Sequence, residues 1–155
     1  MSFKKAVTKT HLLENAFEKG LGALRPEDKP HIQAEDTRKL IGSVDIDKAY
    51  TSEDPNGNRW DFAIGYKHSN RKADFVYWVE LHTASDSQIK VVIKKARWLL
   101  NWFKSCGKEL AKFDREIVWV SSGSTRLTPS ASQSKQLAQS GLKQTGGTLK
   151  INNRR

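Results

Sequence analysis

Two acidic residues, Asp61 and Glu80, stand in segments where apolar and polar side chains alternate with the period of a β-strand. The polar stretch 68–73 between these segments predicts the loop of a hairpin. If the hairpin closes symmetrically, Lys67 faces Asp74 and, in the same register, Asp61 faces Glu80. Directly opposed carboxylates repel, by about 4 kcal/mol at ~4 Å and an effective dielectric of ~20, and a divalent cation would convert this repulsion into a binding site. The pair therefore predicts a metal clamp.

The elements that must position this pair follow from the rest of the pattern. The strand predicted at 115–120 contains the apolar run Ile117-Val118-Trp119-Val120, which is typical of parallel pairing with both faces buried. The predicted order, helix, three strands, helix, strand, indicates an α/β fold (α-β-β-β-α-β) with a mixed central β-sheet flanked by helices on both faces. In chain order, we predict a helix at 8–24, a loop at 25–39, a strand at 41–50, a turn at 52–58, the hairpin, a long helix carrying apolar residues from Ile89 to Phe103, the strand at 115–120, a helix at about 130–140 and a short strand at 148–151.

The charge balance predicts a polyanionic partner. The chain has 27 Lys and Arg residues against 17 Asp and Glu residues, a formal net charge of +10, and no acidic residue follows Glu116. We expect nucleic acid, DNA or RNA, ahead of an anionic membrane or protein surface. Solvated helix faces are the alternative interpretation of the lysines. The residues that we assign to nucleic-acid binding are Lys90, Lys94, Lys95, Arg126, Lys135 and Lys143.

Other bulk properties narrow the class of protein. With 37% hydrophobic residues and five Trp, the composition is that of a folded globular protein, which we expect to form one domain, 1–155, with a basic, acid-free C-terminal extension from about residue 121. No apolar run approaches the ~18 residues of a membrane helix, so we expect no membrane partner. Cys106 is the single cysteine and allows no internal disulfide. Segment 1–6 lacks the apolar core of a secretory signal, and we expect a cytoplasmic location.

The element order, with Asp61 at the start of the second strand and Glu80-Leu81-His82 in the third, resembles that of the PD-(D/E)XK nucleases, which have the restriction-endonuclease-like fold. The resemblance covers about residues 8–120. It implies that Asp61 and Glu80 bind one or two Mg²⁺ (or Mn²⁺) ions, with the backbone carbonyl of Leu81 as a further ligand. In that family, a Lys on the third strand helps to activate or orient the attacking water.

The chain departs from the family pattern at His82, which takes the position of that Lys. A neutral imidazole can accept a proton from water or ligate a metal, and an imidazolium can face a phosphate, but neither supplies a permanent positive charge. We expect His82 to orient or deprotonate the attacking water. Lys67 shares the predicted face of Asp61, although its partner Asp74 favours an ordinary salt bridge. Lys90 or Lys94 could instead reach in from the following helix.

Further acids are candidates for a supporting role. The resemblance implies an acid on the first helix, which would be Glu14 or Glu18, although both also fit a polar helix stripe. Asp45 and its neighbour Asp47 lie on the adjacent predicted strand, where solvated or salt-bridged side chains are favoured. Glu80 stands between apolar neighbours, where an unpaired charge is costly, so two solvated carboxylates on an exposed sheet face are the less favoured interpretation.

These observations favour a metal-dependent nuclease that hydrolyses phosphodiester bonds in DNA or RNA. The main alternative is a catalytically inactive protein of the same fold that binds nucleic acid or a partner protein, and the His at position 82 motivates it. A third reading is a basic protein-interaction subunit whose charge serves an acidic protein. The sequence leaves open whether the protein forms a homodimer or has an accessory protein partner.

Overall fold

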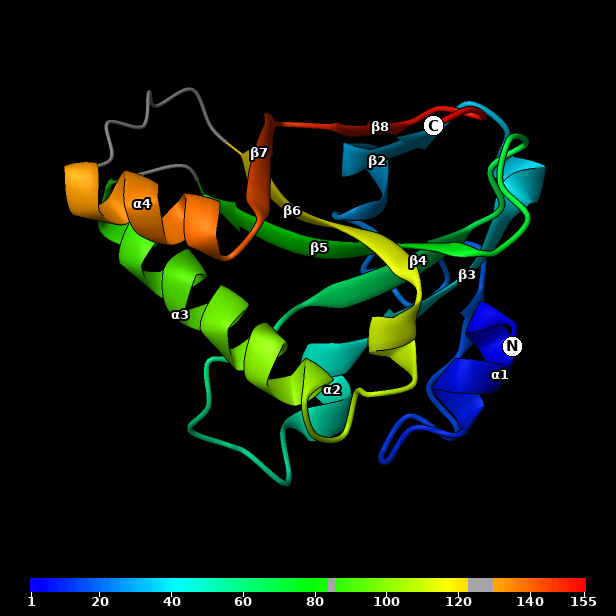
Figure 1. The fold of residues 1–155 in the computed structure, drawn as a ribbon, viewed down its shortest axis with the longest axis horizontal. Coiled ribbons are helices and arrows are strands. Elements are labelled where there is room, and N and C mark those ends of the chain that lie inside the picture. Colours follow the sequence, from blue (N-terminus) through cyan, green and yellow to red (C-terminus); the bar gives the residue numbers. More distant parts are fainter. Residues whose placement is uncertain (84–85, 123–129) are drawn as a thin grey trace.

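A six-stranded mixed sheet forms the centre of the protein in a computed structural model that describes residues 1–83, 86–122 and 130–155 (Figure 1). The spatial order is β1-β3-β4-β5-β6-β7. The pairs from β1 to β5 are antiparallel, whereas β5, β6 and β7 run parallel. The mixed sheet predicted from the sequence is therefore present. Its strands are β1 (Glu18–Lys19), β3 (Leu40–Asp45), β4 (Phe62–Tyr66), β5 (Phe75–Thr83), β6 (Asp114–Ser122) and β7 (Leu142–Gly146).

The hairpin of β4 and β5 has the register that the alternation predicts. Its paired residues run from Phe62 opposite Val79 to Tyr66 opposite Phe75. Continued by one residue at each end, the same register sets Asp61 against Glu80 and Lys67 against Asp74. The second of these pairs is the predicted ion pair, with Lys67 Nζ 3.8 Å from Asp74 Oδ1. The symmetric closure of the hairpin is confirmed.

The two faces of the sheet are covered by different kinds of structure, which corrects the prediction of helices on both. Apolar side chains of α1 (Phe3–Thr8), α2 (Ile46–Tyr50), α3 (Asp86–Phe103) and α4 (Ala131–Gln139) belong to clusters on one face. The opposite face is covered by a small parallel sheet of β2 (Ile32–Ala34) and β8 (Leu149–Ile151), which lies on the far side from the helices in Figure 1. The apolar side chains of β2 and β8 bury this face, so it needs no helix.

The first helix is shorter and earlier than the predicted 8–24. Helix α1 covers Phe3–Thr8, and its first backbone N–H, that of Phe3, donates to Asp74 Oδ2 at 2.8 Å. The chain then leaves the helical conformation, since Leu12 has a positive φ of 67°. Leu13 and Leu24 are buried, but from turns rather than from a helix. Helical spacing of apolar residues misled the prediction because consecutive turns bury side chains at similar intervals.

Helix α1 lies very close to the sheet, and a glycine allows this contact. A Cβ built on Gly65 of β4 would lie 2.4 Å from the ring of Phe3. Both residues are on the helix-covered face, since side chains that alternate with Gly65 point to the other side. Gly65 therefore permits the first helix to pack directly on the strand that begins after Asp61.

The predicted strand at 41–50 is a strand followed by a helix. Strand β3 ends at Asp45, whose side chain accepts a hydrogen bond of 2.8 Å from the backbone N–H of Lys48 and so caps α2. Ile46 and Tyr50, four residues apart, are buried on the same helix face. Alternation of apolar and polar residues therefore continues through a short helix, and this pattern alone cannot tell the helix from a continued strand.

The C-terminal part of the chain belongs to the same fold. The predicted helix at about 130–140 is α4, capped by Ser130 and Gln133, and the predicted last strand is β8. The sequence did not indicate β7, which joins the main sheet, or β2, which lies in the predicted loop 25–39. Three short 3₁₀ helices complete the described elements, at Lys29–His31, Thr37–Lys39 and Leu110–Lys112. None of the described helices has the length and apolar character that crossing a membrane requires.

Candidate active site

Helix α3 brings a lysine to the two predicted acids. Its apolar side chains recur every three or four residues and face the sheet, and Lys95 lies on this buried face, three residues after Val92 and four before Leu99. Only 14% of the Lys95 side chain is exposed, whereas Lys90 and Lys94 on the same helix point into solvent. A lysine at a core position of an amphipathic helix is the sequence signal that singles out Lys95 for a site role rather than for general nucleic-acid contact.

Asp61, Glu80 and Lys95 form a closed hydrogen-bonded cluster. Lys95 Nζ donates to Asp61 Oδ1 at 3.2 Å and to Glu80 Oε2. The remaining carboxylate oxygens accept from the backbone of the opposite strand, Glu80 Oε1 from the N–H of Asp61 at 3.2 Å and Asp61 Oδ2 from the N–H of Leu81 at 3.1 Å. One oxygen of each carboxylate is thus fixed by the hairpin, and the other two converge on one cation.

Burial controls the protonation of this cluster. Glu80 is fully buried, and this is the main reason that its pKa rises to about 7. The charge of Asp61 adds to the rise, while His82 and Lys95 oppose it. Burial lowers the pKa of Lys95, but the carboxylates of Glu80 and Asp61 outweigh that effect and leave it above its ordinary value. Lys95 is therefore a permanent cation, whereas Glu80 changes charge near neutral pH.

His82 is hydrogen-bonded through one ring nitrogen and lies close to Glu80 with the other. Its Nε2 contacts Oε1 of Gln88 in the first turns of α3, and because that amide oxygen can only accept, Nε2 carries a proton. Its Nδ1 lies 3.6 Å from Glu80 Oε2. The interaction with the Glu80 carboxylate is the main cause of a raised pKa of His82. In this arrangement His82 supports Glu80, and its Nε2 is not free to accept a proton from water.

The predicted supporting acids do not join the cluster. Asp45 caps α2. Burial is the main reason that the pKa of Asp45 is raised, and the nearby charge of Asp61 contributes to the rise. Glu14 accepts from the N–H of Leu12 in an exposed turn, and Glu18 is exposed on β1. The first helix was expected to carry both glutamates, but it ends at Thr8, before either of them. Lys67 is at the far end of β4, paired with Asp74.

The predicted nucleic-acid contacts have different environments. Lys90, Lys94 and Lys135 are exposed on α3 and α4. Lys143 on β7 is also exposed, but its Nζ lies 3.5 Å from Glu116 Oε1 on the opposite sheet face from Asp61. Arg126 lies outside the described residues.

The carboxylate pair suits a hard divalent cation that keeps most of its water ligands. Mg²⁺ is commonly held by one or two carboxylates, with water and substrate phosphate in the remaining positions, and Asp61 Oδ1 and Glu80 Oε2 provide such a pair. The described residues contain no group of three or more His, Cys, Asp or Glu side chains arranged for a metal. Because Lys95 contacts the same two oxygens, a metal ion would compete with its ammonium group.

Comparisons of the chain with protein-family models, with curated proteins and with solved structures give no match. What the site does must therefore be argued from its own geometry.

Proposed function

We propose that this protein is a metal-dependent nuclease in which Asp61 and Glu80 hold Mg²⁺ or Mn²⁺ and Lys95 supplies the positive charge that His82 cannot. The observation that carries the proposal is the convergence of two carboxylate oxygens from adjacent strands on the buried ammonium group of Lys95. An acid pair with an adjacent lysine is the set of groups expected from the resemblance to the PD-(D/E)XK nucleases, with the lysine on α3 instead of the third strand.

Each residue has a definite task in this proposal. Asp61 and Glu80 would hold the metal ion, which would supply a coordinated water of lowered pKa and positive charge beside the scissile phosphate. The backbone N–H groups of Asp61 and Leu81 fix the orientation of the two carboxylates. With a metal ion on the carboxylates, the ammonium group of Lys95 would be available to a phosphate oxygen or to the attacking water. His82 keeps Glu80 oriented through Nδ1.

A groove lined by residues whose charges interact with Asp61, although not by Asp61 or Glu80 themselves, offers a path for the substrate. Its cavity of about 620 Å³ is lined by Arg25, Asp45 and Lys48, among others. A hydrogen bond with Asp28 is the main cause of the raised pKa of Arg25. The carboxylate of Asp61 lies close enough to add to this rise. A nucleic-acid backbone in the groove would meet the guanidinium of Arg25 near the carboxylates, and cationic side chains commonly position phosphates in this way.

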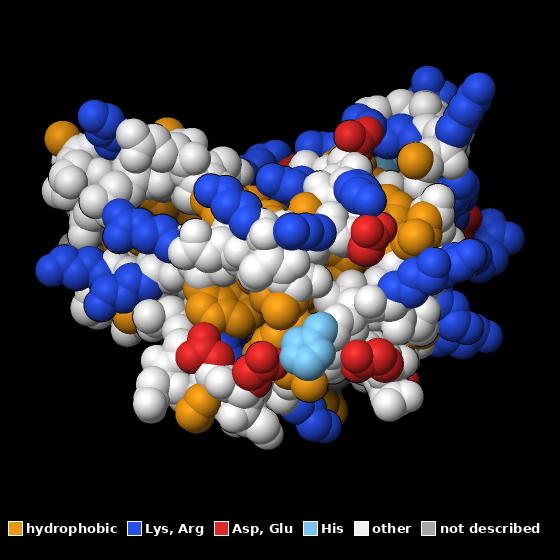
Figure 2. All heavy atoms as spheres, turned by 60° about the horizontal axis from the view of Figure 1, so that its bottom comes forward, with side chains coloured by type: hydrophobic (Ala, Val, Ile, Leu, Met, Phe, Trp, Pro, Cys, Tyr) orange, Lys and Arg blue, Asp and Glu red, His pale blue; other side chains and the backbone are white. Residues whose placement is uncertain are grey.

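The surface charge fits a nucleic-acid substrate. Figure 2 shows one face of the molecule on which Lys and Arg side chains gather, mostly in its upper part, with few Asp and Glu side chains. The exposed cations of α3 are Lys90, Lys94 and Arg97. Because phosphate contacts release counterions, binding through such residues should weaken steeply as salt increases.

Cleavage of plasmid DNA, single-stranded DNA and RNA with Mg²⁺ or Mn²⁺ tests the proposal. We expect Asp61→Asn and Lys95→Met each to lower the cleavage rate about 100-fold, the usual effect of losing a group that stabilises transition-state charge. Lys104→Met, which removes an exposed lysine just after α3, is the matched control and should keep the wild-type rate. Full activity of Asp61→Asn would refute the proposal.

Metal affinity provides a second readout. Because Lys95 occupies the oxygens that a metal would use, Lys95→Met should bind Mn²⁺ more tightly than the wild type while cleaving more slowly. Calorimetric titration with Mn²⁺ measures this difference. Weaker Mn²⁺ binding by Lys95→Met would show that the ammonium group does not compete with a metal at the acid pair.

A catalytically inactive nucleic-acid-binding protein is the second candidate, and the same lysine favours it. The ammonium group of Lys95 already satisfies both carboxylates, so the cluster is also a complete structural ion pair. Salt-dependent binding of DNA or RNA by the wild type, without cleavage of any substrate in the panel, would select this candidate.

A further inference from the structure

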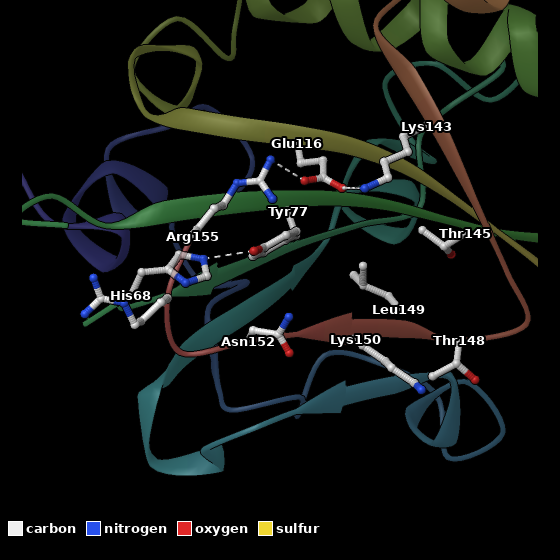
Figure 3. A pocket seen from close by; sticks show the side chains of 11 residues that line it. His68, Tyr77, Glu116, Lys143, Thr145, Thr148, Leu149, Lys150, Asn152 and Arg155 are labelled. Atoms are coloured by element: carbon white, nitrogen blue, oxygen red, sulfur yellow. Dashed lines mark hydrogen bonds and ion pairs between the residues drawn. The ribbon is translucent and has the colours of Figure 1, made fainter. Parts of the chain in front are cut away.

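A second polar pocket lies on the face of the sheet opposite the acid pair. Tyr77 on β5 points into it, whereas Glu80, three residues further along the same strand, points to the helix-covered face. The walls come from β7 and from the C-terminal segment that includes β8 (Figure 3). The pocket has a volume of about 490 Å³, within the range of small-molecule sites. It takes no part in the proposed cleavage.

A buried carboxylate lies at one side of this pocket between two cations. Glu116 on β6 is only 9% exposed, and Figure 3 shows Arg155 and Lys143 reaching it from different directions. Arg155 Nη2 lies 2.5 Å from Glu116 Oε2, and Lys143 Nζ lies 3.5 Å from Oε1. A carboxylate can accept about four hydrogen bonds, so Glu116 keeps capacity for donors of a ligand.

Two further cations at the pocket have no acid to neutralise them. Lys150 on β8 and Arg154 line the pocket, are exposed, and have no Asp or Glu partner among the residues that the structure describes. With Lys143 and Arg155 set against Glu116, the lining has three positive charges in excess. Hydroxyl groups of Thr145 and Thr148 and the amide of Asn152 add neutral hydrogen-bonding groups. This combination suits a phosphate group.

The pocket is held in place by contacts that do not involve a ligand. His68 Nδ1 lies 3.3 Å from the carbonyl oxygen of Asn153 and therefore donates, so Nε2 accepts from the hydroxyl of Tyr77 at 2.9 Å. Tyr66 donates to the Asn153 side chain at 2.8 Å, and the backbone N–H of Arg155 donates to Asn70 at 2.9 Å. A wall that is already ordered costs less conformational entropy when a ligand binds.

We propose that this pocket binds a small phosphorylated molecule of mononucleotide size, with its phosphate against Lys150 and Arg154 and its hydrogen-bond donors directed to Glu116. The position of the carboxylate decides the orientation, because a phosphate next to Glu116 would be repelled, whereas a sugar or base can donate to it. The recess extends to Tyr77, which is 3% exposed, and a duplex backbone cannot follow it to that depth.

Calorimetric titration of the full chain with AMP, GMP, CMP and UMP tests the proposal, with inorganic phosphate and the free nucleosides as separate arms. We expect saturable binding of at least one mononucleotide, tighter than that of phosphate or of its nucleoside. The double substitution Lys150→Ala/Arg154→Ala should weaken it at least 10-fold. The matched control, Lys104→Ala/Lys108→Ala, removes the same charge from exposed residues that do not line the pocket and should leave the Kd within about 2-fold.

Three results would overturn the proposal: no saturable binding of any mononucleotide, equal weakening by both double substitutions, or inorganic phosphate binding as tightly as the nucleotide. Binding of a 12-nucleotide DNA but of no mononucleotide would also overturn it and would assign these cations to the nucleic-acid surface. The titration requires no cleavage, so its outcome is independent of the proposed nuclease activity.

Discussion

Replacing Glu80 by Gln should change how the stability of the protein depends on pH. Burial raises the pKa of Glu80 from 4.5 to about 7, so the folded protein binds this proton more tightly than the unfolded chain does. The resulting stabilisation is complete below pH ~4.5 and is lost as the pH rises through ~7. The difference between the two pKa values corresponds to about 3 kcal/mol. The raised pKa of His82, caused mainly by Glu80, acts in the same direction.

Urea unfolding between pH 4 and pH 8, followed by the fluorescence of the buried Trp residues, measures this effect. Relative to Glu80→Gln, the wild type should lose about 3 kcal/mol of unfolding free energy over that range. The control is Glu53→Gln, which removes an exposed carboxylate that also pairs with a histidine, His11 at 3.0 Å. Its profile should follow the wild type within about 0.5 kcal/mol. Parallel profiles for the wild type and Glu80→Gln would show that Glu80 is not a buried carboxylate with a raised pKa.

Three further changes test the packing around the site. Lys95→Met leaves two buried carboxylates without a cation and should destabilise the protein by about 3 kcal/mol at pH 8. The loss should be smaller at pH 5, because Glu80 is then protonated. Equal losses of unfolding free energy at both pH values, measured with urea, would contradict this. Gly65→Ala places a methyl group 2.4 Å from the Phe3 ring and should cost about 1–3 kcal/mol, which a thermal melt detects; an unchanged Tm would show that α1 does not pack directly on β4. Asp74→Ala removes the acceptor for the Phe3 N–H and should cost about 1 kcal/mol of stability. Amide hydrogen exchange should then be faster in α1 than in α3. Uniform exchange in the two helices would argue that Asp74 does not cap α1.

The hairpin and its acid pair could be predicted because their signals are local. Alternation fixes which side chains share a face, and the polar loop 68–73 fixes the register, so Asp61 and Glu80 meet whatever surrounds them. Helix α3 and strand β6 were equally clear, since one has a strong helical period and the other contains the continuous apolar run Ile117-Val118-Trp119-Val120.

The rest depends on contacts between distant parts of the chain. Strand β2 exists because it pairs with β8, more than a hundred residues later, and the segment of β2 has no strong strand pattern by itself. The tertiary position of Lys95 was missed because the neighbouring basic residues suggested a common phosphate-binding role for the whole helix. Its spacing from Val92 and Leu99 was present in the sequence and would have distinguished it from Lys94.

The most direct test of the central claim is the initial rate of phosphodiester cleavage by the wild type and by Glu80→Gln, measured side by side with Mg²⁺ and with EDTA on DNA and RNA. Gln keeps the shape of Glu80 but removes the charge that would hold the metal. We predict cleavage by the wild type that EDTA abolishes and a rate at least ~100-fold lower for Glu80→Gln, equivalent to about 3 kcal/mol of transition-state stabilisation. Equal rates for the two proteins, or no cleavage of any substrate by the wild type, would contradict the account.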